Sequence, residues 1–163
     1  MTKDDLLAAM ARECDLCVHL HGKVPPGGME FRLTPAQRST AELLRYLSYS
    51  GIGISRSLLA GSFDPYHALA KEAESLAPAG FPAAMERQKG ALRDLFAGLS
   101  GADYAAKPVA QPWGTTRPLG AALVEFPYAT LVAYRMQLFL QAKAAGNGAL
   151  STANCWGGRD AAS

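Results

Sequence analysis

The chain has 163 residues, which suits one domain built around a single hydrophobic core. Hydrophobic residues make up 49% of it and charged residues 18%, a composition typical of a folded globule and not of a disordered chain. The net charge is +2, and the 16 basic residues form neither a block nor a patch interleaved with aromatics, so nucleic acid is not an expected partner.

The N-terminal segment does not resemble a targeting signal. Its start, MTKDD, carries two acidic residues where a secretory signal would be basic, and the apolar run that follows is broken by Arg12 and Glu13. No stretch approaches the ~18 uninterrupted apolar residues that a membrane span needs. Three cysteines give no disulfide framework, so we expect no membrane association and a location in the reducing cytoplasm.

The balance of residue types favours helices over strands. Alanine occurs 30 times, whereas valine and isoleucine together occur only 7 times. Alanine loses no side-chain entropy in a helix, and β-branched residues are the ones that half-buried strands prefer. The sequence therefore predicts an all-α protein.

A first helix is predicted from Thr2 to about His21. Thr2 and, three residues later, Asp5 form a capping-box pattern beside the positive end of the helix. Gly22 and the run Pro25–Gly28 end it. The helical period selects the side chains of its buried face, namely Leu6, Leu7, Met10, Cys14, Cys17 and Val18.

A second helix is predicted to open at Ser39 or Thr40, with Glu42 in its first turn. Two glycines, Gly51 and Gly53, should weaken this helix near its far end. In a helix interior each glycine costs roughly 1 kcal/mol relative to alanine.

A short inserted helix and a third long helix follow. Asp64 as a cap and Pro65 at the first helical position predict the short helix, which should run to Leu76. The third helix is expected to start around Pro82 and to stop at Ser100, where a glycine follows. The short helix would then be an insertion between the main helices.

The fourth long helix is predicted over Pro118–Ala145, after an irregular stretch at 101–117. Pro127 lies inside it and removes one backbone hydrogen bond, so a kink is expected there. The tail, 147–163, has no hydrophobic period and is expected to be irregular. Four long helices predict a bundle with its core in residues 2–146, in one domain spanning the whole chain.

Two segments resemble motifs of the DinB-like superfamily of four-helix bundles. The segment 38–47, RSTAELLRYL, resembles that family's serine-capped helix, in which Glu-Leu-Leu precedes a histidine. The segment 134–140, YRMQLFL, resembles its last helix, where two histidines stand four apart and the second is followed by arginine, one residue, glutamine and leucine. The resemblance implies a DinB-like bundle over roughly residues 2–146, with a short inserted helix and an irregular C-terminal tail.

In that family three histidines bind a divalent metal, one from the second helix and two from the fourth. The matching positions here are Tyr46, Thr130 and Tyr134, whose neutral hydroxyls are poor ligands for zinc or nickel. The chain's three histidines lie outside the motif. We therefore expect no metal cofactor, and the family's thiol-transfer and isomerisation chemistry does not carry over to this chain through those positions.

Polar residues replace the metal ligands on the fourth helix. Thr130, Tyr134, Gln137 and Gln141 recur at spacings of four, three and four, so they share a narrow sector of a helix that is otherwise largely apolar. An unpaired buried polar group costs about 1–3 kcal/mol, so these side chains need partners. The partners are either protein groups such as Tyr46, or water and a ligand in a residual pocket. The second reading makes Tyr46, Thr130, Tyr134 and Gln137 the candidate ligand-binding residues.

Two further groups of residues have alternative interpretations. Cys14, Cys17 and His21 cluster on one side of the first helix and are suitable types for zinc, but three ligands from one helix seldom converge, which favours two buried thiols beside a helix-terminal histidine. Trp113 and Trp156 lie in loop segments, where burial against the bundle end or a partner subunit is favoured over stacking on a ligand.

The sequence leads to two hypotheses about function. The first is a DinB-like protein without the three-histidine metal site, which binds a small molecule or acts as an interaction protein. The alternative is an enzyme with thiol-transferase or hydrolase-type activity that uses a metal bound elsewhere or the Tyr46 and Tyr134 hydroxyls as acids. A fourth helix that is apolar on many sides also predicts a homodimer built on helix faces.

Overall fold

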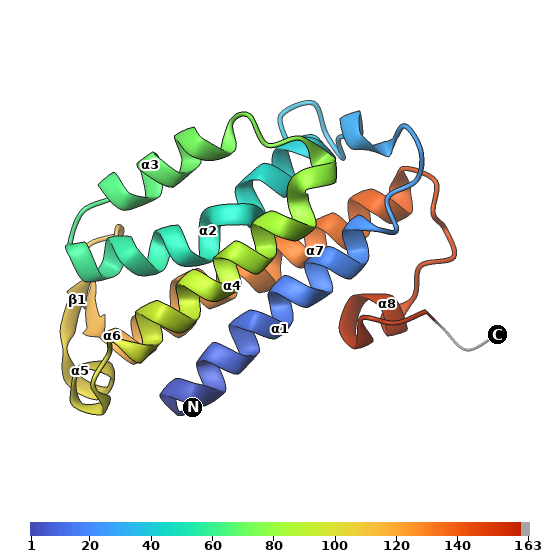
Figure 1. Ribbon diagram of the computed structural model, residues 1–163. Coiled ribbons are helices and arrows are strands. Elements are labelled where there is room, and N and C mark those ends of the chain that lie inside the picture. Colours follow the sequence, from blue (N-terminus) through green and yellow to red (C-terminus); the bar gives the residue numbers. More distant parts are fainter. Residues whose placement is uncertain (161–163) are drawn as a thin grey trace.

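The computed structural model describes residues 1–160, and helices form most of this part of the chain. Four long helical segments run along one another in Figure 1: α1 (Lys3–His21), α2 (Thr40–Ala60), α4 (Phe81–Ala97) and a last segment that ends in α7 (Ala129–Ala144). α1 and α2 each contact both α4 and α7, so the four segments enclose a common core. The prediction of a mostly helical chain is confirmed.

Local capping explains where α1 and α2 begin. The Thr2 hydroxyl accepts a hydrogen bond from the Asp5 amide, and the Asp5 carboxylate accepts one from the Thr2 amide. Ser39 and Glu42 repeat this reciprocal pair at the start of α2. Each capping box satisfies amide groups that the first turn of a helix leaves free, as the sequence predicts.

The core lies between the four long segments and consists mainly of leucine, with a few larger side chains from α1 and α4. Its largest fully buried apolar members are Leu6, Met10, Leu20, Leu43, Leu44, Leu47, Ile54, Phe81, Met85, Leu92 and Phe96. The fourth segment adds Leu131 and Leu138, which are also fully buried. Of the face predicted for the first helix, Leu6, Met10, Cys14 and Cys17 lie in this cluster, and Leu7 and Val18 pack against it half-buried.

α2 continues without a break through its two glycines. These residues allow neighbouring side chains to approach the helix closely. A Cβ atom at Gly51 would lie 3.0 Å from Leu131 Cδ1 and 3.2 Å from Gln88 Oε1. The buried Gln88 side chain donates to the Leu47 carbonyl and accepts from the Ile52 amide, so it inserts between successive turns of α2. Such an insertion bends a helix, and α2 is bent in its middle in Figure 1. The helix continues to Ala60.

The inserted helix is α3 (Asp64–Ala73), which ends three residues earlier than predicted. Asp64 is its first helical residue and not its cap, and the carboxylate accepts a hydrogen bond from the Ser62 hydroxyl. α3 packs against α2 on the outside of the bundle (Figure 1). A short 3-10 turn, Pro78–Gly80, then leads into α4.

Two segments that the sequence analysis treated as irregular have regular structure. Residues 101–117 contain α5 (Gly101–Ala106) and most of an antiparallel hairpin between β1 (Pro108–Ala110) and β2 (Thr116–Pro118), so the chain is not purely α-helical. Three-residue strands are too short to show an alternating pattern, which explains why the prediction was wrong.

The second correction concerns the C-terminal tail, where α8 (Thr152–Gly157) forms. Ser151 and Asn154 make a capping box at its start, a pattern that is visible in the sequence although no hydrophobic period follows it. α8 packs against α1 and α7. Residues 161–163, the end of the predicted tail, lie outside the described residues.

The last long segment is interrupted where the sequence predicted a kink. It begins as α6 (Leu119–Leu123), widens into a π-helical turn at Val124–Tyr128 and continues as α7. Pro127 lies in this turn, and its missing amide hydrogen explains the break in regular hydrogen bonding. Within residues 1–160, no helix is both long and apolar enough to cross a membrane.

Candidate functional site

The structure brings two of the predicted ligand-binding residues into direct contact. Tyr46 on α2 and Tyr134 on α7 have ring centroids 4.6 Å apart, in an edge-on arrangement. The guanidinium carbon of Arg38 lies 4.2 Å from the centre of the Tyr46 ring and 5.6 Å from that of Tyr134. Cation–π attraction therefore ties the segment before α2 to both rings.

The Tyr46 phenol is a weaker acid than an ordinary tyrosine, so it holds its proton and can donate a hydrogen bond. Its ring is partly buried, and burial raises the pKa of Tyr46 well above its ordinary value, with the neighbouring hydroxyls of Tyr66 and Tyr134 adding to the effect. The pKa of Tyr49, one turn away, is raised by burial in the same way. Both phenols are therefore protonated at neutral pH.

The other predicted positions are less closely joined. Thr130 is buried on α7 and Gln137 is half-buried. Gln141 donates from Nε2 to the Arg38 carbonyl at 2.8 Å, while its buried Oε1 has no hydrogen-bond partner within residues 1–160. That Tyr46, Thr130, Tyr134 and Gln137 together contact a ligand stays a prediction.

A small hollow of about 270 Å³ opens beside Tyr46, between α2 and α3. Among the four predicted residues only Tyr46 lines it. Its other walls are Arg38, Glu42, Arg45, Tyr49, Ala70, Ala73 and Glu74. The Glu42 carboxylate already has hydrogen-bond partners, because it caps α2 and pairs with Arg32.

A larger cavity of about 430 Å³ lies on the other side of the α2–α3 contact, where α4 forms the third wall. Tyr49 and Ala73 line both spaces. The remaining lining residues are Ser48, Ile52, Arg56, Leu69, Glu72, Ser75, Leu76, Ala77, Ala84, Arg87, Gln88 and Ala91. Its volume falls in the range of small-molecule sites, and several small alanine side chains leave this space open.

The cavity combines an apolar floor with charged groups at its rim. Ile52 is buried and Leu69 half-buried at the floor, whereas Arg56, Glu72 and Arg87 are exposed. Sequence analysis missed this site, because its charged residues come from three helices and share no motif. Only the packing of α3 and α4 against α2 brings them together.

A buried ion pair lies on the opposite side of the bundle. Arg135 is completely buried on α7 and donates from Nε to the buried Glu13 carboxylate of α1. From Nη1 it also donates to the Cys155 carbonyl at 2.6 Å, and its guanidinium carbon lies 4.5 Å from the centre of the Trp156 ring. Arg135 thereby links α1, α7 and α8. An arginine in a largely apolar helix was the available sequence signal.

The two tryptophans are less buried than expected. Trp113 is 54% exposed at the turn of the hairpin and packs on Phe126, with ring centroids 5.1 Å apart. Trp156 is 52% exposed over the Arg135 guanidinium. Burial against the bundle end is therefore only partial for both rings, and burial against a partner subunit stays a prediction.

The thiols of α1 are buried, as the preferred interpretation expected. Cys14 and Cys17 are fully buried and not in disulfides, and burial raises the pKa of Cys14 to about 12 and that of Cys17 well above its ordinary value. Neither thiol is therefore a ready nucleophile at neutral pH. His21 is half-buried and packs on Phe81, with ring centroids 5.5 Å apart. In residues 1–160, no three His, Cys, Asp or Glu side chains form a group that could hold a metal ion.

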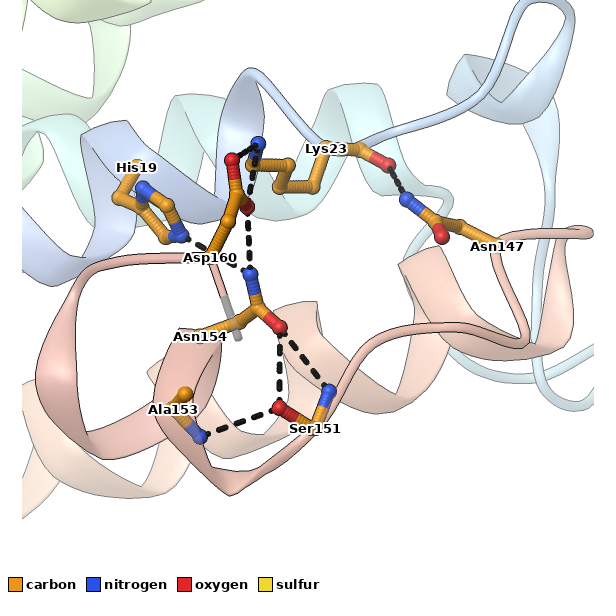
Figure 2. Close-up of polar contacts among 7 residues, drawn as sticks. All are labelled: His19, Lys23, Asn147, Ser151, Ala153, Asn154 and Asp160. Carbon is orange, nitrogen blue, oxygen red and sulfur yellow. Dashed lines mark hydrogen bonds and ion pairs between the residues drawn. The ribbon is translucent and has the colours of Figure 1, made fainter. Parts of the chain in front are cut away.

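Figure 2 shows a polar network that fastens the C-terminal segment to α1 and the loop after it. Asn154 Nδ2 lies 3.3 Å from His19 Nε2 and 2.9 Å from Asp160 Oδ1, and Asp160 in turn pairs with Lys23. Asn147 donates to the Lys23 carbonyl at 2.9 Å. This network, together with Arg135, gives α8 a structural role that does not require a ligand.

Comparison with known proteins adds no relative: the chain matches no protein-family model and no curated protein. The resemblance to DinB-like proteins therefore rests on the residues of α2 and α7 alone.

Proposed function

We propose that this protein binds a small organic molecule in the cavity between α2, α3 and α4. The observation that carries this proposal is the cavity itself, about 430 Å³ in volume, with an apolar floor and a charged rim. Binding sites for small molecules are typically concave and mostly apolar, with a few polar groups that orient the ligand.

We further propose that the chain is a DinB-like bundle in which Tyr46, Thr130 and Tyr134 occupy the metal positions. The contact between Tyr46 and Tyr134 supports this alignment, because the corresponding ligands must approach one another. The proposal places the protein in a reducing cytoplasm, where its three free thiols would remain reduced.

Binding without catalysis is the better-supported alternative. The buried thiols have raised pKa values, and burial likewise keeps the Tyr46 phenol protonated. An enzyme of the thiol-transferase or hydrolase type needs an activated nucleophile or a base, and these groups supply neither at neutral pH.

The proposal is tested with thermal melts of the protein in the presence of a library of small molecules. A ligand that binds only the folded chain raises the melting temperature as its concentration increases. We expect at least one compound to do so, and the substitution Ala91→Phe, which fills part of the cavity, to abolish the effect. Ala97→Phe is the matched control, because Ala97 is exposed on the same helix and does not line the cavity.

Two results would contradict the proposal. One is a library in which no compound stabilises the wild-type protein. The other is a stabilising compound that acts equally on the wild type, the Ala91→Phe variant and the Ala97→Phe variant. Far-ultraviolet circular dichroism of both variants shows whether their helices are intact.

A further inference from the structure

The charges around the cavity are not balanced by one another. Arg56 from α2, Glu72 from α3 and Arg87 from α4 line the cavity, and none of them forms an ion pair with another residue of the described chain, 1–160. Two guanidiniums and one carboxylate leave an excess of positive charge.

From this arrangement we propose that the natural ligand is an amphipathic organic anion, a carboxylate or phosphate group on an apolar body. This inference rests on the proposed function and adds the chemical class of the ligand. Arginine holds a planar fork of donors that matches a carboxylate or phosphate, and it remains charged at every physiological pH.

The apolar part of the ligand is assigned to the floor of the cavity. Ile52, Leu69 and Leu76 contribute branched side chains there, and Ala84 and Ala91 provide room beside them. Burying an apolar chain against this floor supplies binding energy at roughly 25 cal/mol per Å² of surface removed from water. A fully polar anion would forgo that contribution and leave the floor wet.

Gln88 does not contribute to charge recognition, although it lines the cavity. Its side-chain amide already makes hydrogen bonds with the Leu47 carbonyl and the Ile52 amide of α2. Glu72 is the remaining charged group of the lining and opposes an anion by like-charge repulsion. The two arginines therefore determine the sign of the ligand, and Glu72 limits its affinity.

Three probes, each with an unbranched ten-carbon skeleton, separate the contribution of charge from that of apolar burial. Isothermal titration calorimetry at low ionic strength compares decanoate, decanol and decyltrimethylammonium. We expect decanoate to bind with one site, decanol about fivefold more weakly, and the cation most weakly. The advantage of decanoate over decanol should shrink as salt is added, because the rim is exposed to solvent.

Substitutions then assign the charge preference to named residues. Arg56→Gln and Arg87→Gln should each weaken decanoate binding about fivefold and leave decanol binding unchanged. Glu72→Gln should strengthen decanoate binding by a similar factor. Arg93→Gln is the matched control, since Arg93 is an exposed arginine of α4 that does not line the cavity.

The results distinguish failure of this inference from failure of the proposed function. If decanol binds as tightly as decanoate, and the arginine substitutions change neither affinity, the cavity takes apolar ligands and the anion assignment is overturned. If none of the three probes binds, or if Ala91→Phe binds all of them like the wild type, the anion assignment fails and the cavity is not their site. Stabilisation by other library compounds, lost in Ala91→Phe, would in that case still uphold the proposed function.

Discussion

Replacing Glu13 by glutamine tests the structural importance of the buried ion pair. Arg135 is completely buried and Glu13 is 4% exposed, so Glu13→Gln leaves a guanidinium in the interior without a compensating charge. Removing one partner of such a pair typically costs about 3–5 kcal/mol. We expect the lower end, about 3 kcal/mol, because the glutamine oxygen can still accept from Nε. For a chain of this length that lowers the melting temperature by about 6–12 °C.

Urea denaturation followed by circular dichroism measures this change in the free energy of unfolding. The matched control is Asp15→Asn, which breaks an ion pair between the exposed Asp15 carboxylate and Lys89, and should cost less than about 1 kcal/mol. Adding Arg135→Met to Glu13→Gln removes the uncompensated charge, so the double variant should be more stable than the sum of the single effects predicts. A Glu13→Gln variant within about 1 kcal/mol of the wild type would refute the reasoning.

Three further predictions concern the metal positions, acid stability and assembly. The triple variant Tyr46→His, Thr130→His and Tyr134→His should gain a three-imidazole site and be stabilised by added zinc or nickel. The wild type should bind neither metal in stoichiometric amount. Metal analysis and thermal melts of both proteins test this. The arginine partner and the Ser39 amide lower the pKa of Glu42 from near 4.5 to about 2, so its contribution to stability is complete above pH 4.5 and is lost as the pH falls toward 2. Melting temperatures measured over that range should therefore fall less steeply in Glu42→Gln, and parallel curves would contradict this. Sedimentation at high micromolar concentration should show a homodimer, and a monomer throughout would count against the predicted assembly.

The positions of the long helices were determined by the sequence, because the signals that set them are local. Thr2 and Ser39 cap their helices by bonding to amides only three residues away. The helical period of apolar residues likewise identifies a buried face without reference to what covers it. These features would be the same in any bundle built from these segments.

Some local signals were present but too short to be decisive. Ser151 caps α8 in the same way, yet a helix of six residues buries too little surface to show a hydrophobic period. The three-residue strands of the hairpin pose the same difficulty. Both elements depend on packing against the bundle, which is why their residues looked irregular in sequence.

The candidate site was decided by tertiary structure alone. Tyr46 contacts Tyr134 of the fourth helix, which is one of the two alternatives that the polar sector of that helix left open. The cavity could not be predicted, since Arg56, Glu72 and Arg87 belong to different helices and converge only when α3 folds back across α2. Likewise, no local rule shows whether an arginine in an apolar helix will find its carboxylate on another helix, as Arg135 does with Glu13. Local sequence determines which helices form, and long-range packing determines which of their polar groups meet.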